Sequence, residues 1–173
     1  MQNGHNVEVG VVGREGMVGI AAFMGSGTAL NQTVVQIGNG SLRMPVSPLV
    51  EEFRRGGALH DVLLRYAHSL YGMATYVAAC NRLHQIDERL ARWLLMCQDR
   101  ARTETLALTQ ELLGQMLGAE RQSVTVAALT LQEMELINYA RGRITILDRQ
   151  GLEAAACECY SAISGLFDGT LES

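Results

Sequence analysis

The chain has 173 residues, 48% of them hydrophobic and 18% charged, and it is long enough to bury one or two modest cores. Its formal net charge of −4 argues against a protein that binds nucleic acid nonspecifically through bulk positive charge. No apolar run is long enough to cross a bilayer, and the start Met1-Gln2-Asn3-Gly4 is unlike a signal peptide. The composition therefore predicts a cytoplasmic protein with no membrane partner.

Residues 1–46 are rich in glycine and contain several short β-prone runs. Nine glycines fall here, between runs at 7–9, 11–12, 17–23, 33–37 and 41–44. Alternating apolar residues and turn signals predict an antiparallel sheet or a partial barrel. Such an open sheet would leave strand edges unpaired, which favours aggregation unless they are covered.

Residues 47–84 are expected to form a short helix followed by a long one, with Gly56-Gly57 at the start of the long helix. Side chains in the long helix repeat at alternating intervals of four and three residues, through Leu59, Leu63, Tyr66, Leu70, Met73 and Val77 and on to Cys80 and His84. This repeat of 3.5 residues is typical of a coiled-coil seam and predicts a homodimer. The alternative is a helix packed on a sheet of its own chain.

Residues 108–147 predict a helix-turn-helix followed by a small hairpin. Two short helices, 109–116 and 121–134, are joined by a Leu117-Gly118-Ala119 turn, and the hairpin is tipped by Arg141-Gly142-Arg143. Two sets of apolar side chains follow helical spacing and are expected to face the core: Leu112, Leu113, Met116 and Leu117, then Val124, Ala127, Ala128 and Leu131.

The opposite face of the second helix carries side chains that suit DNA. Arg121, Gln122 and Thr125 are the candidates for base contacts, and Val126 is a candidate for contact with a thymine methyl group. The candidates for phosphate contacts are Thr109, Ser123, Arg141 and Arg143. This pattern predicts sequence-specific binding with the second helix in the major groove. Because residues 82–150 contain nine arginines and nine acidic residues, affinity should depend on dimerisation and direct readout.

The four cysteines, Cys80, Cys97, Cys157 and Cys159, show neither a CxxC pair nor a zinc-ligand spacing, so no metal site is predicted. They are expected to be reduced thiols that pack in the interior. A redox-active pair at Cys157 and Cys159 is the alternative, but side chains two residues apart on a helix point about 200° apart.

The chain resembles the Crp/Fnr family of bacterial transcription regulators, from about Val7 onward and most specifically over residues 82–160. The residues that carry the resemblance are Arg89-Leu90-Ala91-Arg92-Trp93-Leu94-Leu95, Leu108-Thr109-Gln110-Glu111-Leu112-Leu113, Leu117-Gly118, Val124-Thr125, Leu136-Ile137, Arg141-Gly142-Arg143-Ile144-Thr145-Ile146 and Gly151-Leu152-Glu153. The resemblance implies a cytoplasmic homodimer that reads a palindromic operator, with the long helix as its interface. RNA polymerase is a further candidate partner.

The fold class that follows is α+β, with a partial antiparallel β-roll, a long dimerisation helix and a C-terminal winged helix-turn-helix. Expected regions are a cyclic-nucleotide-binding-like β-roll at 1–46, a short helix and the dimerisation helix at 47–84, the DNA-binding domain at 85–160 and a C-terminal tail at 161–173. The resemblance implies that only about the second half of the family's sensor roll is present. The chain is either a natural short form or a sequence whose start was assigned too far downstream.

The resemblance also bears on the ligand of this partial sensor. Cyclic-nucleotide binders of the family place a Glu for the ribose and an Arg for the phosphate in this segment, where Ile20 and Leu30-Asn31 stand. Cyclic AMP is therefore not expected to bind, because its charge would be buried without a partner. No cofactor is predicted: the segment has no cysteine cluster for an iron–sulfur centre, and haem on one of the histidines His5, His60, His68 and His84 is a weaker alternative.

An enzyme is not predicted, because no catalytic triad, phosphate-cradling loop with lysine or HExxH motif is present. A second class is a dimeric interaction module that has lost DNA binding or competes with full-length relatives. Glu120, next to the first recognition residue, favours this class since it would lie near DNA phosphates. A salt-titrated band-shift assay separates the two classes.

Overall fold

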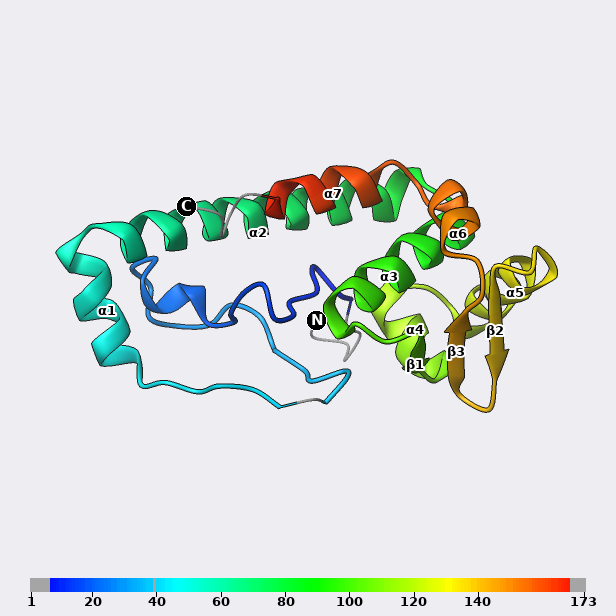
Figure 1. Cartoon of the computed structure of the whole chain (residues 1–173), viewed down its shortest axis with the longest axis horizontal. Coiled ribbons are helices and arrows are strands. Elements are labelled where there is room, and N and C mark those ends of the chain that lie inside the picture. Colours follow the sequence, from blue (N-terminus) through cyan, green and yellow to red (C-terminus); the bar gives the residue numbers. More distant parts are fainter. Residues whose placement is uncertain (1–6, 39, 169–173) are drawn as a thin grey trace.

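The computed structural model describes residues 7–38 and 40–168, and His5 lies outside them. The elements in chain order are η1 (Ile20–Ala22), α1 (Val46–Arg55), α2 (Ala58–Leu83), α3 (Ile86–Ala101), β1 (Thr105–Ala107), α4 (Gln110–Leu117), α5 (Arg121–Glu133), β2 (Ile137–Ala140), β3 (Arg143–Ile146), α6 (Arg149–Ala155) and α7 (Cys159–Phe167). In Figure 1, helix α1 lies at one end of the molecule, and the long helix α2 runs along one edge with α7 beside it. Helices α3 to α6 gather with the small sheet at the end opposite α1. Among the described helices, none is both long enough and apolar enough to span a bilayer.

The C-terminal elements enclose the main hydrophobic core. Helix α3 begins with a capping box in which Gln85 and Glu88 satisfy each other's backbone N–H groups. It contributes Trp93 and Leu94 to a cluster that contains side chains of every element from β1 to α6. The core positions expected on the second helix, Val124, Ala127, Ala128 and Leu131, are all at most 3% exposed. The amphipathic pattern read from the sequence is confirmed here.

The small sheet is antiparallel, with strand order β1-β3-β2. Leu106 pairs with Ile144 on one side, and Ile137 pairs with Ile146 on the other. The turn between β2 and β3 has positive φ at both central residues, 52° at Arg141 and 72° at Gly142. Two left-handed residues in a two-residue loop match the twist of the strands, which explains why the hairpin forms here. Strand β1 was not anticipated, because its three residues are too few to show a period.

Helix α2 is covered along its apolar face by other parts of the same chain. Met73, Val77 and Cys80 lie in a cluster with Ile163 of α7, and Leu63 packs with Phe23 and with Leu49 of α1. The expected tail from residue 161 differs from the structure, because α7 is a helix that continues to Phe167. Apolar side chains at helical spacing in this segment gain more from burial against α2 than from remaining in water.

The expected partial β-roll is not formed. Residues 7–38 and 40–45 contain one short 3₁₀ helix, η1, and no strand. A β-strand needs a neighbour for its backbone groups, and an isolated pair is at best marginally stable. The runs at 7–9, 11–12 and 17–23 contact side chains of α2 and α3 instead, whereas residues 33–35 and 41–44 are exposed.

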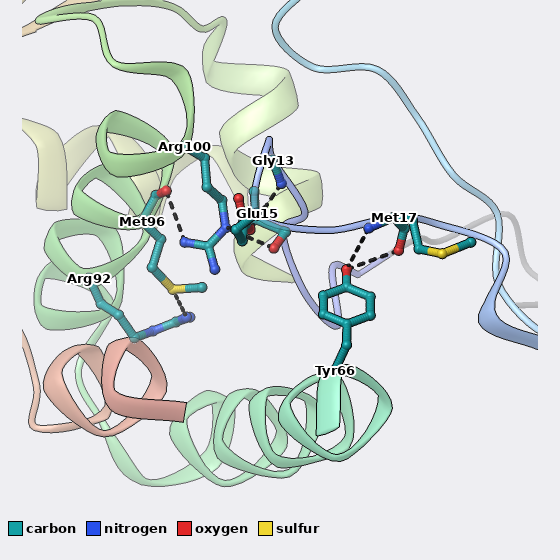
Figure 2. A network of polar contacts seen from close by, with 8 residues as sticks. Gly13, Glu15, Met17, Tyr66, Arg92, Met96 and Arg100 are labelled. Atoms are coloured by element: carbon teal, nitrogen blue, oxygen red, sulfur yellow. Dashed lines mark hydrogen bonds and ion pairs between the residues drawn. The ribbon is translucent and has the colours of Figure 1, made fainter. Parts of the chain in front are cut away.

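Polar contacts fix this N-terminal segment to the helices (Figure 2). Arg100 of α3 donates through Nε to the backbone carbonyl of Val11 at 2.9 Å, and the same Nε lies 2.9 Å from the Glu15 carboxylate. The Tyr66 hydroxyl of α2 accepts a hydrogen bond from Met17 N at 3.0 Å and donates one to Met17 O at 2.9 Å. Side chains from the helices therefore satisfy backbone groups that a sheet would otherwise have paired.

Candidate nucleic-acid interface

Helices α4 and α5 form a helix-turn-helix whose boundaries follow from local sequence. Thr109 caps α4, since its Oγ1 accepts a hydrogen bond from Leu112 N at 3.2 Å. Gly118 ends the helix in the left-handed conformation, with φ 58°, and its N–H donates to Gln115 O. Helix α5 then begins at Arg121, one turn away. Both helices lie within one residue of the ranges expected from the sequence.

A shallow groove of about 390 Å³ lies where α4, α5 and the hairpin meet. Thr109 at the start of α4, Arg121 at the start of α5 and Arg141 at the hairpin tip all line it. Arg121 is exposed and its Nε donates to Gln110 Oε1 at 3.2 Å, so the guanidinium is held over the groove. One predicted base contact and two predicted phosphate contacts therefore face a common concave surface.

The other predicted contact residues lie around this groove and do not line it. Gln122 and Ser123 are exposed on the first turn of α5, and Val126 is 63% exposed one turn further. Thr125 is half-buried, and its hydroxyl donates to the Arg121 carbonyl at 2.9 Å. The hydroxyl proton of Thr125 is therefore used within the helix, and its oxygen can still accept a hydrogen bond from DNA. Arg143, at the start of β3, is exposed.

Two groove residues were missed by sequence reasoning. Gln110 follows the α4 cap directly, and Tyr139 on β2 donates its hydroxyl to the Leu108 carbonyl at 3.2 Å. Burial raises the pKa of Tyr139, and the positive charge of Arg121 opposes that shift. The alternation of β2 puts Tyr139 on the same face as the buried Ile137, but only the docking of the hairpin beside α4 and α5 brings it into the groove. Glu111 also lines the groove and is the one acidic side chain among its described residues.

The predicted dimer seam lies mostly inside the chain. Leu63, Tyr66, Met73 and Val77 are between 2% and 7% exposed, Leu70 packs against the cluster under α7, and Leu59 is 36% exposed. The described chain itself supplies the neighbours that a second copy would have supplied in a coiled coil. Packing within one chain was the alternative left open by the sequence, although the neighbours are helices and an extended segment and not a sheet.

The family comparison agrees with this geometry. A model of the Crp-like helix-turn-helix domain matches residues 88–155, which contain α4, α5 and the hairpin. No curated protein sequence matches the chain.

Three solved structures share part of this fold. FixK2 from Bradyrhizobium japonicum aligns with a TM-score of 0.58 and 20% identity over 65% of this chain and 59% of its own. A Crp/Fnr family transcriptional regulator from Eubacterium rectale aligns with a TM-score of 0.51 and 22% identity, over 64% and 51%. A variant of CooA from Carboxydothermus hydrogenoformans gives 0.50 and 20%, over 62% and 51%.

The chain thus spans between 51% and 59% of the length of these three proteins. At 20–22% identity, the structural alignments show a shared fold. The sequence match to the family model covers only the helix-turn-helix domain, residues 88–155. The chain carries a Crp-like helix-turn-helix domain over residues 88–155 and shares the fold of Crp/Fnr family transcriptional regulators.

Proposed function

We propose that this protein is a DNA-binding transcription regulator, with α5 in the major groove and the hairpin against the backbone. The groove that joins the start of α4, the start of α5 and the hairpin tip carries this proposal. A recognition helix reads base edges with its first residues, while the preceding helix and the wing contact phosphates. Thr109, Arg121 and Arg141 all line this groove, as expected if Arg121 contacts a base and the other two contact phosphates.

The charge distribution supports specific binding over nonspecific binding. Arg121, Arg141 and Arg143 supply a local positive patch on a chain whose net charge is −4. Glu111 on the groove wall and Glu120 before α5 place negative charge beside this patch, which weakens its attraction for phosphates in general. Affinity for random DNA should therefore be low and should fall steeply with salt.

The test is a binding-site selection followed by salt-titrated binding to the selected duplex. Arg121→Ala should weaken binding to that duplex by about 1–3 kcal/mol and relax the preference at one base pair per half-site. The matched control is Arg54→Ala, which removes an exposed arginine from α1 at the other end of the molecule. If no sequence is enriched, the DNA-binding proposal is wrong and the interaction-module class replaces it. If Arg121→Ala binds the selected duplex with the affinity and selectivity of the parent protein, Arg121 is not a base-contacting residue.

The wing has a separate signature in the same assay. Replacing both Arg141 and Arg143 with Ala should weaken binding to all sequences alike and lower the salt slope by roughly one or two per protomer. A loss confined to one base position would instead make the hairpin a base reader.

We also propose that the regulator is a homodimer, since two half-sites one helical turn apart are read by two copies. The seam through Leu63 and Leu70 is available to a partner only if α7 and the N-terminal segment move away. The exposed face of α2 offers another heptad-spaced row: Leu64 is 48% exposed, Tyr71 is 72% exposed and Ala78 is exposed. This row is the more accessible interface.

Sedimentation of two charge-substituted proteins separates the two interfaces. Leu64→Glu with Tyr71→Glu should give a folded monomer with greatly reduced affinity for a two-half-site duplex. Leu63→Glu with Leu70→Glu should instead destabilise the chain, because it places carboxylates among buried side chains. A stable monomer from the second pair, and a dimer from the first, would restore the seam read from the sequence.

A further inference from the structure

Three cysteines and one histidine that are far apart in the sequence meet at the junction of α2 and α7. Cys80 and His84 lie one turn apart at the end of α2, and Cys157 and Cys159 lie where α6 gives way to α7. Their ligand atoms, three Sγ and one imidazole nitrogen, are all within 4.8 Å of one another. The cysteines are buried and reduced.

The spacing of the four cysteines in the sequence gave no sign that Cys80, His84, Cys157 and Cys159 come together. Cys80 and His84 share a helix face, because residues four apart lie on the same side. Cys157 and Cys159 would diverge on a helix, but α6 ends at Ala155 and α7 begins at Cys159. Cys157 therefore lies in the irregular junction and Cys159 is the first residue of α7, and their thiols contact Cys80 and His84 respectively.

The distances match a tetrahedral thiolate site. Bond lengths of about 2.3 Å for Zn–S and 2.0–2.1 Å for Zn–N imply ligand atoms about 3.5–3.8 Å apart on the edges of a tetrahedron. Cys80 Sγ lies 3.5 Å from Cys157 Sγ, and Cys159 Sγ lies 3.7 Å from His84 Nδ1. Even the widest pair needs a contraction of only about 1 Å to reach that geometry. A disulfide needs about 2.05 Å between sulfurs, so the described contact is not a bond.

The histidine ring is oriented for this role. While Nδ1 faces Cys159, Nε2 lies 3.1 Å from a carboxylate oxygen of Glu158. Metal-binding histidines usually donate their second N–H to a carboxylate, which fixes the tautomer and makes the ligand nitrogen more basic. Glu158 thus stands where an outer-shell partner is needed.

Two buried arginines of α3 lie close enough to the cluster to interact with its thiols. Arg89 and Arg92 of α3 are 8% and 2% exposed, and the Nε of each has no hydrogen-bond partner among the described residues. Neither forms an ion pair with a carboxylate within the described chain; Arg92 bonds Met96 Sδ, and Arg89 bonds Asn81 and the Leu117 carbonyl.

We propose that Cys80, His84, Cys157 and Cys159 bind one zinc ion in a structural Cys₃His site. On binding, each thiol releases its proton to solvent, and three thiolates around a divalent ion leave one net negative charge. Arg89 and Arg92 lie beside the cluster to balance it. The site joins the end of α2 to the start of α7 and so fixes how the helix-turn-helix domain is held on the long helix.

The first test is cobalt titration of the reduced, chelator-treated full-length protein. Co²⁺ should bind at one ion per chain and give the intense visible bands and near-ultraviolet charge transfer of a tetrahedral thiolate complex. One equivalent of Zn²⁺ should abolish this spectrum, because zinc binds such sites more tightly than cobalt. The absence of binding, or the weak bands of an octahedral complex, would overturn the proposal.

Variants assign the ligands. Cys80→Ser, Cys157→Ser and Cys159→Ser should each weaken Co²⁺ binding by about tenfold or more and shift its spectrum, and Glu158→Gln should weaken it about 10–100-fold. The control is Cys97→Ala, which removes the remaining cysteine from the core of the domain and should leave spectrum and stoichiometry unchanged. Equal binding by the three serine variants would rule out this site.

A second measurement needs no variant and so does not depend on whether a variant folds. Zinc should slow alkylation of Cys80, Cys157 and Cys159 in the parent protein, mapped by peptide mass spectrometry, and leave the rate at Cys97 unchanged. Unchanged rates at the first three thiols would contradict the proposal. A Cys80–Cys157 disulfide in the purified chain, together with a reduced chain that binds no zinc, would show a redox pair in place of a metal site.

Discussion

The helix-turn-helix domain and the N-terminal segment of residues 7–45 are held in place by different kinds of interaction. The domain has a continuous core in which Leu90, Leu94, Leu113 and Ile144 are completely buried. Among its described residues the segment contributes one buried hydrophobic side chain, Phe23. Its other contacts are partly buried apolar side chains, Val11, Met17, Ile20 and Ile37, and polar contacts to α2 and α3. The segment should therefore detach without unfolding the domain, because the loss of its contacts leaves the core of the domain intact.

The largest expected effect is a cavity in the domain core. Leu113→Ala should lower the free energy of unfolding by about 2–5 kcal/mol, since it removes a completely buried side chain. Leu30→Ala is the control in the segment, where the leucine is 90% exposed and the change should stay within about 0.5 kcal/mol. Urea denaturation measures both. Similar losses for the two variants would mean that the regions do not differ as described.

A smaller effect is expected from the arginine that holds the segment. Arg100→Ala removes the bond to the Val11 carbonyl and leaves the Glu15 carboxylate, 22% exposed, without its cation. Loss of a charged hydrogen bond should cost about 1–3 kcal/mol of stability. Limited proteolysis should then cleave within residues 7–45 while the domain stays intact, and Arg14→Ala, at an exposed position, should not change the cleavage pattern. Cleavage that begins in the helix-turn-helix domain would show that the domain, and not the N-terminal segment, opens first.

The smallest effect concerns one hydroxyl group. Tyr66→Phe removes the two hydrogen bonds to the Met17 backbone and should cost about 0.5–1.5 kcal/mol. Hydrogen exchange at the Met17 amide should become faster in this variant and stay unchanged in Tyr71→Phe, whose ring is 72% exposed. Burial raises the pKa of Tyr66 to about 12, so these bonds should persist throughout the neutral range. Unchanged exchange in Tyr66→Phe would show that the hydroxyl does not hold the segment.

The same contrast explains what the sequence could predict. The domain follows from local signals: a cap at Thr109, a left-handed glycine at Gly118 and apolar side chains at helical spacing in α5. Each signal acts within a few residues, so pattern and structure agree. The segment has β-prone runs, but whether a run becomes a strand depends on a partner elsewhere in the chain, which local pattern does not specify.

The candidate sites divide in the same way. Arg121 and Arg141 were expected at the interface because helix and hairpin positions fix where they point. Tyr139 was missed, since its place in the groove depends on how the hairpin docks beside α5. The meeting of Cys80 with Cys157 was also missed, because 77 residues separate them and α7 returns alongside α2 only in the folded chain. Both placements depend on how distant segments pack together in the folded chain, and local periodicity does not specify that packing.

The docking of α7 on α2 also has a consequence for synthesis on the ribosome. Met73 and Val77, at 2% and 3% exposure, are shielded partly by Ile163, which is translated long after them. At the usual 5–20 residues per second, the gap of roughly 90 residues leaves the apolar side of α2 uncovered for about 4–18 seconds in each nascent chain. During that interval the long helix is a natural client for ribosome-associated chaperones, and crowded polysomes expose many copies of it at once.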